Sequence, residues 1–230
     1  MTVDFAFFHV GEDFILPKML CESIKITNPN SNIIQLTDKK TPILSKLVSK
    51  FLRVDGNKDN LMFLRSKAYQ SYKIDNPTLF LDTDMLVIKE IDGNKIFNDK
   101  NYIFLERFYD ALINPEYLKI HKLEQYNGKT WKQFCPYLGC LIGAKDQIIL
   151  REIHKNYMKL DQQYRKWNGD QMALHETFEK FNGIGLVTEK YYANPLKEDI
   201  NLDEIFILHF KGNKKDMMKP YFDRIFNNGK

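Results

Sequence analysis

Two aspartates, Asp82 and Asp84, directly follow a short apolar run and are well placed to do chemistry. The run Leu79–Leu81 is apolar throughout, which indicates a strand buried on both faces. Because side chains alternate along a strand, the two carboxylates are expected to project to the same side. Two like charges that close repel unless a cation lies between them, and hard oxygen ligands suit Mg²⁺ or Mn²⁺. The alternative is a turn, since aspartate is common where strands end.

A second set of residues with suitable chemistry follows the apolar run 205–208 near the end of the sequence. His209 offers an imidazole that can complete the ligand shell of a Mn²⁺-like ion. Gly212 allows the backbone to approach a phosphate, and Lys214 or Lys215 can neutralise its charge. The simpler interpretation is a hydrogen-bonded histidine followed by a basic turn.

Two basic residues, Arg65 and Lys67, lie on a predicted helix over 61–72, just before the Asp-x-Asp strand. Either side chain can reach the same anion from the other side, although charged helix residues usually face water. A metal ion, a lysine and an arginine together are a common means of stabilising a departing diphosphate.

The elements that must position these residues alternate along the chain. Strands are predicted at 5–10, 32–36, 51–54, 79–81, 102–105, 137–143, 185–187 and 205–208. Helices are predicted over 15–26 and 61–72, from Ile148 onwards, and over 171–181, where Asp170 is a plausible N-cap. Residues 114–131 receive no assignment. The alternation predicts one α/β domain over 1–230, with a mainly parallel sheet and helices on both faces.

The amino-acid composition limits the classes of protein to which this chain can belong. The 230 residues are 43% hydrophobic, enough for a sizeable core, and the net charge of +4 comes from 34 basic and 30 acidic residues that are interspersed. That mixture does not indicate a nucleic-acid partner. The apolar runs fall short of the roughly 20 residues of a membrane span, and the start lacks a basic signal-peptide region. With Cys21, Cys135 and Cys140 as reduced thiols, a cytoplasmic protein is expected.

The order of these motifs resembles that of a known family. Asp82-x-Asp84 after an apolar strand, then Asp170-Gln171, then His209-x-x-Gly212-x-x-Lys215, is similar to the GT-A nucleotide-sugar glycosyltransferases. The resemblance is greatest to glycosyltransferase family eight and extends from the first strand to about Pro220. It implies a Rossmann-like GT-A domain, with a nucleotide-binding half over 1–90 and an acceptor half over 91–230.

The resemblance also implies roles for individual residues. Asp82, Asp84 and His209 would hold Mn²⁺ or Mg²⁺, which would bridge the phosphates of a UDP-sugar. The other donor contacts would come from Gly212 and Lys215 at the diphosphate, Arg65 or Lys67 at phosphate or sugar, and His9 and Asp38 at the uridine. Asp170, with Gln171, would lie beside the transferred sugar and the acceptor hydroxyl. The acceptor would be a glycan, a lipid-linked sugar or a protein.

The sequence departs from the family pattern at one strand and leaves alternatives open. Family members often carry an asparagine where this chain has 137–140, Tyr-Leu-Gly-Cys, which concerns the sugar contacts. A sugar nucleotidyltransferase is one alternative, although the residues after the first strand, 9–13, are acidic rather than basic and glycine-rich. A non-catalytic module that binds anions or nucleic acid through its basic C-terminal segment is another. The aromatic and basic tail 210–230 is a candidate for peripheral membrane contact.

Overall fold

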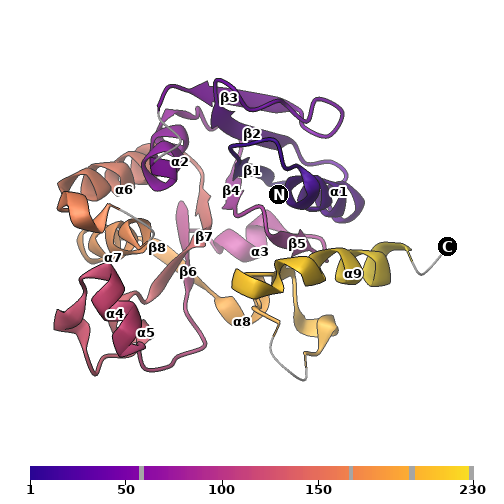
Figure 1. Ribbon diagram of the computed structural model, residues 1–230. Helices are drawn as coiled ribbons and strands as arrows, with labels where there is room; N and C mark the ends of the chain where they lie inside the picture. The colour runs from indigo at the N-terminus through magenta and orange to yellow at the C-terminus, as the bar shows by residue number, and fades with distance from the viewer. Residues whose placement is uncertain (57–59, 166–167, 197–199, 228–230) are drawn as a thin grey trace.

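A mixed sheet forms the centre of the molecule in the computed structural model, which describes residues 1–56, 60–165, 168–196 and 200–227 (Figure 1). Its seven strands lie in the order β3-β2-β1-β4-β7-β6-β8. They are β1 (Asp4–Phe8), β2 (Ile33–Asp38), β3 (Lys50–Val54), β4 (Thr78–Leu81), β6 (Tyr102–Glu106), β7 (Tyr137–Ala144) and β8 (Ile184–Thr188). Among these strands only β7 runs against its neighbours, β4 and β6. The predicted α/β fold with a mainly parallel sheet is confirmed.

Helices cover both faces of this sheet, as predicted (Figure 1). The longer ones are α1 (Ile15–Thr27), α2 (Leu61–Ser71), α6 (Ile148–Lys159) and α7 (Gly169–Lys180). Short helices are α3 (Gly93–Phe97), α4 (Pro115–His121), α5 (Trp131–Phe134), α8 (Glu189–Tyr192) and α9 (Met218–Phe222). Single helical turns are η2 (Glu124–Tyr126), η3 (Gln162–Tyr164), η4 (Leu202–Glu204), η5 (Gly212–Met217) and η6 (Asp223–Asn227). One core contains residues of α1, α3 and α9, and the opposite core contains residues of α2, α6 and α7.

Strand β4 is fixed by burial on both faces. Leu79 and Leu81 pack into the core beside α1, and Phe80 packs into the core beside α2. All three side chains are at most 1% exposed, and each contributes about 1.5–3 kcal/mol of burial free energy. The position at which β4 ends, and hence the position of Asp82, is therefore set by the core.

The two aspartates do not lie in a strand, which corrects the expectation from strand alternation. Strand β4 ends at Leu81, and Asp82, Thr83 and Asp84 form a turn before β5 (Met85–Val87). Strand β5 leaves the main sheet and pairs antiparallel with β9 (Ile207–His209) in a two-stranded sheet. The turn after β4 therefore brings the two carboxylates near each other, and the pairing of β9 with β5 brings His209 to them. The pleat of a single strand does not produce this arrangement.

The segment that received no assignment forms a small helical lobe between β6 and β7. Helix α4 is capped by Asn114, and α5 begins with a capping box between Thr130 and Gln133. Aromatic residues of the segment pack with α7 residues and with Tyr164 in a third apolar cluster. The segment lacks a clear apolar period because α4, η2 and α5 are too short to show one.

Several element boundaries differ from those predicted. Strand β1 ends at Phe8, which leaves His9 in a loop, and His209 closes β9 instead of following it. Helix α7 begins at Gly169, so Asp170 lies in its first turn and is not the N-cap. All three cysteines are buried and free. Within the described ranges, the helices are too short or too polar to cross a membrane.

Candidate active site

The carboxyl ends of neighbouring strands bring the candidate residues to one edge of the sheet. Strands β2, β1 and β4 are adjacent and parallel, so Asp38, His9 and Asp82 emerge at the same edge. Strand β6 runs in the same direction and ends at Glu106. Ligand sites of open α/β sheets lie at this edge.

Asp82, Asp84 and His209 form a cluster that can hold a metal ion. One potential ligand atom from each residue lies within 4.8 Å of the other two. The Nε2 atom of His209 is 3.4 Å from Oδ1 of Asp84, and the Phe210 amide donates to the Asp84 carbonyl at 2.8 Å. Lys215 completes the surroundings of Asp84, with its Nζ 3.3 Å from Oδ2.

The charges in this cluster stabilise one another. Burial acts to raise the pKa of Asp84, but the His209 hydrogen bond and the Lys215 charge outweigh it and lower the pKa below its ordinary value. Burial acts to lower the pKa of His209, and the neighbouring Cys140 and Asp84 reverse that effect, so the His209 pKa is raised. Burial likewise raises the pKa of the Cys140 thiol, against the charge of His209 and its hydrogen bond.

The donor set fits a divalent cation of the Mg²⁺ or Mn²⁺ class. Two carboxylates and an imidazole are ligands that Mn²⁺ accepts, and ligands on opposite sides of a Mg²⁺ ion lie about 4.2 Å apart. The observed spread of 4.8 Å therefore needs only small side-chain movements. The Nδ1 atom of His209 is buried without a hydrogen-bond partner among the residues the structure describes, while Asp84 and Cys140 lie against the same ring.

Arg65 joins this cluster to Asp170. Its Nη1 donates to Oδ1 of Asp82 at 2.8 Å, and its Nη2 makes a very short contact with Oδ2 of Asp170. Burial raises the pKa of both carboxyl groups, and Arg65 opposes that rise. The same two carboxylates raise the pKa of Arg65 against its own burial, so the guanidinium stays charged.

Gly139 makes room for this ion pair. A Cβ atom at this position of β7 would lie 2.3 Å from Oδ2 of Asp170 and 3.1 Å from Nη2 of Arg65. Real Cβ atoms essentially never come within 3.0 Å of another atom, so a larger residue here would displace the Asp170 carboxylate from its present position. Sequence reasoning did not select Gly139, although a glycine inside a strand is a known signal of close approach by other groups.

The four predicted basic residues fall into two groups: Lys67 and Lys214 bind backbone carbonyls, and Arg65 and Lys215 bind aspartates of the site. Lys67 donates to the Asp55 carbonyl at 2.6 Å, and Lys214 donates to the carbonyls of Pro195 and Leu196. Arg65 and Lys215 are therefore the cations that lie among the three aspartates of the site. Gly212 has a φ of +66°, and a Cβ atom there would meet nothing within 4 Å among the described residues. Its left-handed conformation favours glycine.

His9, just after β1, and Asp38, the last residue of β2, lie close together. The Thr37 hydroxyl donates to the His9 carbonyl at 2.6 Å, and Asp38 accepts from the Lys40 and Thr41 amides. Burial lowers the pKa of His9, in part offset by Asp13 and Asp38. The two residues that the family resemblance places at the uridine are thus on one surface beside β4, and that role stays a prediction.

Sequence reasoning missed two charged residues at strand ends, Arg107 and Glu189. Arg107, just after β6, donates from Nη2 to Oε1 of Gln171 at 3.0 Å. Glu189, just after β8, is completely buried and accepts from the Phe108 and Tyr109 amides. Its other carboxylate oxygen accepts from Nζ of Lys211 at 2.9 Å. A charged residue directly after an apolar strand was the available signal, and it was used only for Asp82 and His209.

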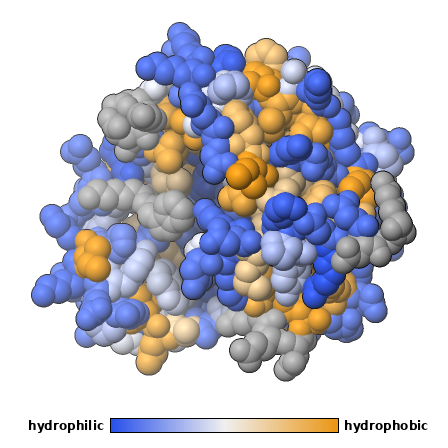
Figure 2. Space-filling model, turned by 45° about the vertical axis from the view of Figure 1, so that its right-hand side comes forward, coloured by the Kyte–Doolittle hydropathy of each residue, from blue (hydrophilic) through white to orange (hydrophobic). Residues whose placement is uncertain are grey.

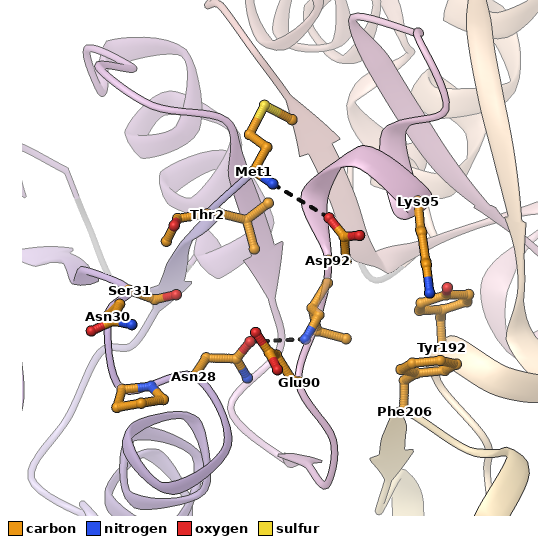
Figure 3. Close-up of a pocket in the computed structure, with 13 residues that line it drawn as sticks. Met1, Thr2, Asn28, Asn30, Ser31, Glu90, Asp92, Lys95, Tyr192 and Phe206 are labelled. Carbon is orange, nitrogen blue, oxygen red and sulfur yellow. Dashed lines mark hydrogen bonds and ion pairs between the residues drawn. The ribbon is translucent and has the colours of Figure 1, made fainter.

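A large cavity formed by described residues lies elsewhere. It measures about 490 Å³ and is lined by Met1, Ser31, Glu90, Asp92, Lys95 and others (Figure 3). Because several of these residues precede β1 or β2, the cavity opens at the amino end of the strands, opposite the candidate site. Two of its charged groups, the Met1 amino group and the Asp92 carboxylate, pair with each other at 3.4 Å. None of the lining residues is among the site residues predicted from the sequence.

Comparison with solved structures identifies the fold. A glycosyltransferase involved in the glycosylation of the major capsid of PBCV-1 matches with a TM-score of 0.60 and 11% identity, over 95% of this chain and 100% of that chain. The glycosyltransferase GlyE of Streptococcus pneumoniae TIGR4 matches with a TM-score of 0.60 and 14% identity over 99% of this chain. The bifunctional glycosyltransferase WbbM in its apo form matches with a TM-score of 0.58 and 12% identity over 98%. The fold is a glycosyltransferase fold.

These likenesses have a defined extent. The chain spans 63% of the GlyE chain and 50% of the WbbM chain. Neither a protein-family model nor a curated protein matches the sequence. At such identities the comparison establishes the fold, and the chemistry has to be argued from the residues of the site.

Proposed function

We propose that this protein is a metal-dependent glycosyltransferase of the GT-A type, most similar to family eight. It transfers a sugar from a nucleotide diphosphate donor, a UDP-sugar, to a hydroxyl group on a glycan, lipid or protein. The observation that carries the proposal is the pairing of β9 with β5, which brings His209 and Lys215 to Asp84. The motif predicted from separate parts of the sequence is thereby assembled at the carboxyl edge of a glycosyltransferase fold.

The proposed donor site uses the cations already described. Asp82, Asp84 and His209 hold Mn²⁺ or Mg²⁺, which when bound supplies positive charge to the two phosphates of the donor. Lys215 is 47% exposed and can move from Asp84 to a phosphate oxygen. The left-handed backbone at Gly212 lets a phosphate approach closely. Together these groups stabilise the negative charge that develops on the departing nucleotide.

The proposed sugar site lies between Arg65 and Gln171. Arg65 fixes the Asp170 carboxylate, so Asp170 has a defined orientation toward the donor sugar. Gln171 occupies the next position of α7 and faces Arg107. Holding donor and acceptor in one geometry supplies much of the rate enhancement of a transfer reaction.

We place the protein in the cytoplasm, with at most peripheral membrane contact.

The contacts of the C-terminal lysines weigh against a nucleic-acid-binding module. Lys211 pairs with Glu189, Lys215 with Asp84 and Lys219 with Asp223, and Lys214 binds backbone carbonyls. The apolar residues of this segment also serve the fold, since Phe210, Met218 and Phe222 are buried. On the face drawn in Figure 2, hydrophobic patches are interspersed with hydrophilic residues.

The experiment is thermal stabilisation by UDP, GDP, CMP and ADP, each with Mn²⁺ and each with a chelator. A ligand that binds only the folded state adds about 2.7 kcal/mol of stability at a hundredfold excess over its Kd. We expect a shift with UDP that needs Mn²⁺ and is lost in Asp84→Asn. Asp161→Asn, an exposed aspartate whose side chain caps nothing within the described ranges, is the matched control.

Other outcomes of these measurements would redirect or refute the proposal. A metal-dependent shift with another nucleotide would change the donor and keep the reaction class. A shift that survives in Asp84→Asn, or no shift with any nucleotide, would refute the proposed metal and donor site. Release of pyrophosphate from a nucleoside triphosphate would indicate a nucleotidyltransferase instead.

A further inference from the structure

Arg107 is a buried cation that donates its hydrogen bonds to neutral groups. The residue is 8% exposed and lies directly after β6. Within the described ranges, its guanidinium forms no ion pair, and its hydrogen bonds go to a carbonyl and an amide oxygen. Buried charges in proteins are normally paired, because an unpaired charge loses its hydration without compensation. Arg65, the other buried arginine of the site, has two carboxylate partners.

The surroundings orient Arg107 through neutral contacts. Its Nε donates to the Cys135 carbonyl at 3.0 Å, and its Nη2 donates to Oε1 of Gln171 at 3.0 Å. The guanidinium lies over the ring of Trp131, 5.5 Å from the centroid. A neighbouring carboxylate, that of Asp110, is exposed and instead accepts from the backbone amides of Ala111 and Lys132. Arg107 lowers the pKa of Asp110 through space, but among the described residues it has a fixed position and no carboxylate in direct contact.

This position is next to the proposed transfer site. Gln171, which Arg107 contacts, follows Asp170 in the first turn of α7. Arg107 also contacts the lobe that contains α4 and α5, through the Trp131 ring and the Cys135 carbonyl. The donor phosphates have their own cations, Arg65 and Lys215. A charge on this side of Asp170 is therefore placed to meet the acceptor.

We propose that Arg107 binds an anionic group of the acceptor, a carboxylate or a phosphate carried by the acceptor glycan. The planar guanidinium matches either group with two parallel hydrogen bonds, which a lysine cannot reproduce. The anion supplies the direct ion-pair partner that the described part of the protein does not provide. This inference rests on the proposed function, because it assigns the substrate class of the acceptor side of that same site.

The test compares three small probes on the full chain in the presence of UDP and Mn²⁺: glucose, glucuronate and glucose 6-phosphate. Their affinities are measured by calorimetric titration for the wild type and for Arg107→Met. We expect one of the two anions to bind about tenfold more tightly than glucose, a preference that Arg107→Met removes. Preference for glucuronate identifies a carboxylate, and preference for glucose 6-phosphate identifies a phosphate.

The matched control is Lys132→Met, which removes an exposed cation of the same lobe that lies 3.9 Å from Glu106. It is expected to keep the preference for the anion. If Arg107→Met does not fold, Arg107→Lys replaces it, since lysine keeps the charge and loses the planar fork; we expect a loss of about tenfold there as well. Equal binding of all three probes by the wild type, or an unchanged preference in the folded Arg107 variant, overturns the proposal.

The two proposals fail in distinguishable ways. Loss of UDP binding with retention of Arg107-dependent anion binding would refute the donor assignment and leave the anion site standing. Metal-dependent UDP binding together with equal affinity for glucose and both anions would keep the glycosyltransferase and refute an acidic acceptor.

Discussion

The imidazole of His209 lies 3.4 Å from the carboxylate of Asp84, although the two residues come from opposite halves of the chain. The register of β5 and β9 fixes this approach, because Met85 pairs with His209 and the Phe210 amide donates to the Asp84 carbonyl. Main-chain bonds, which do not depend on the side chains, hold the segments together. Side-chain substitutions in the cluster should therefore alter ligand binding more than folding.

Gly139→Ala should abolish the proposed sugar transfer beyond its effect on stability. The new Cβ would meet Asp170 and Arg65, so the ion pair has to move, and overpacking costs about 1–3 kcal/mol. Gly143→Ala is the matched control, because Gly143 lies on the same strand as Gly139 but away from the site. A Cβ atom at Gly143 would lie 2.3 Å from the Ile103 side chain. Urea unfolding and turnover at a temperature where both variants are folded are measured. Equal turnover of the two variants would contradict the role given to Gly139.

Lys215→Met should weaken UDP binding, whereas Lys214→Met should lower the stability of the fold. Lys215 forms a partly exposed ion pair with Asp84, worth about 0–1 kcal/mol to the fold, but its loss should weaken UDP binding about tenfold or more. Lys214 binds two carbonyl groups, so its replacement should cost about 1–3 kcal/mol of stability and leave UDP affinity unchanged. Titration with UDP and with uridine checks this: Lys215→Met should bind uridine normally, and weakened uridine binding would refute a phosphate contact.

The carboxylate of Asp38 should stabilise the fold at neutral pH and not in acid. Burial acts to raise its pKa, but hydrogen bonds from Thr41 and from the Lys40 amide outweigh burial and lower the pKa below its ordinary value. A lowered folded-state pKa contributes stability that is complete above the unfolded pKa of about 3.9 and is lost as the pH falls through the folded value.

Asp38→Asn tests this, because asparagine keeps the acceptor oxygen and loses the charge. The wild type should be the more stable protein at about pH 6, and the difference should shrink toward about pH 3. Urea denaturation at both pH values measures it, with Asp161→Asn as the control that should match the wild type at each. A difference as large at the lower pH as at the higher would show that the charge of Asp38 does not stabilise the fold.

Glu189→Gln should lower stability, because Glu189 holds both the segment after β6 and the segment after β9. The buried carboxylate accepts from the Phe108 and Tyr109 amides and from Lys211, so we expect a loss of about 1–3 kcal/mol of stability. A double-mutant cycle with Lys211→Met should give a coupling energy of about 0.5–3 kcal/mol. The exposed pair Lys219–Asp223 should give a much smaller coupling energy in the same measurement, because solvent screens it. Coupling no larger than that of the surface pair would show that Glu189 does not hold Lys211.

The apolar pattern of the sequence predicted most of the fold. The runs before Asp82 and before His209 are strands, and the helices over 15–26 and 61–72 agree closely with α1 and α2. These elements were predictable because each has its own burial pattern, which local sequence records directly. The lobe between β6 and β7 was not predicted, since its short helices depend on one another for burial.

The choice between Arg65 and Lys67 needed the tertiary structure. On a helix of 3.6 residues per turn the two side chains point about 200° apart, so only the packing of α2 decides which one faces β4. Arg107 and Glu189 were missed for a related reason. Their roles arise at strand ends that become neighbours of α7 and of Lys211 only when the sheet is assembled.

The sequence by itself determined which residues are candidates for the chemistry: Asp82, Asp84 and His209, each next to an apolar run, and Lys215, three residues after Gly212. The tertiary structure alone decided the arrangement. Pairing between strands distant in the chain depends on which apolar faces meet, and that information is distributed over both cores. It placed His209 against Asp84, and it set β7 antiparallel so that Gly139 leaves space for the ion pair that orders the site.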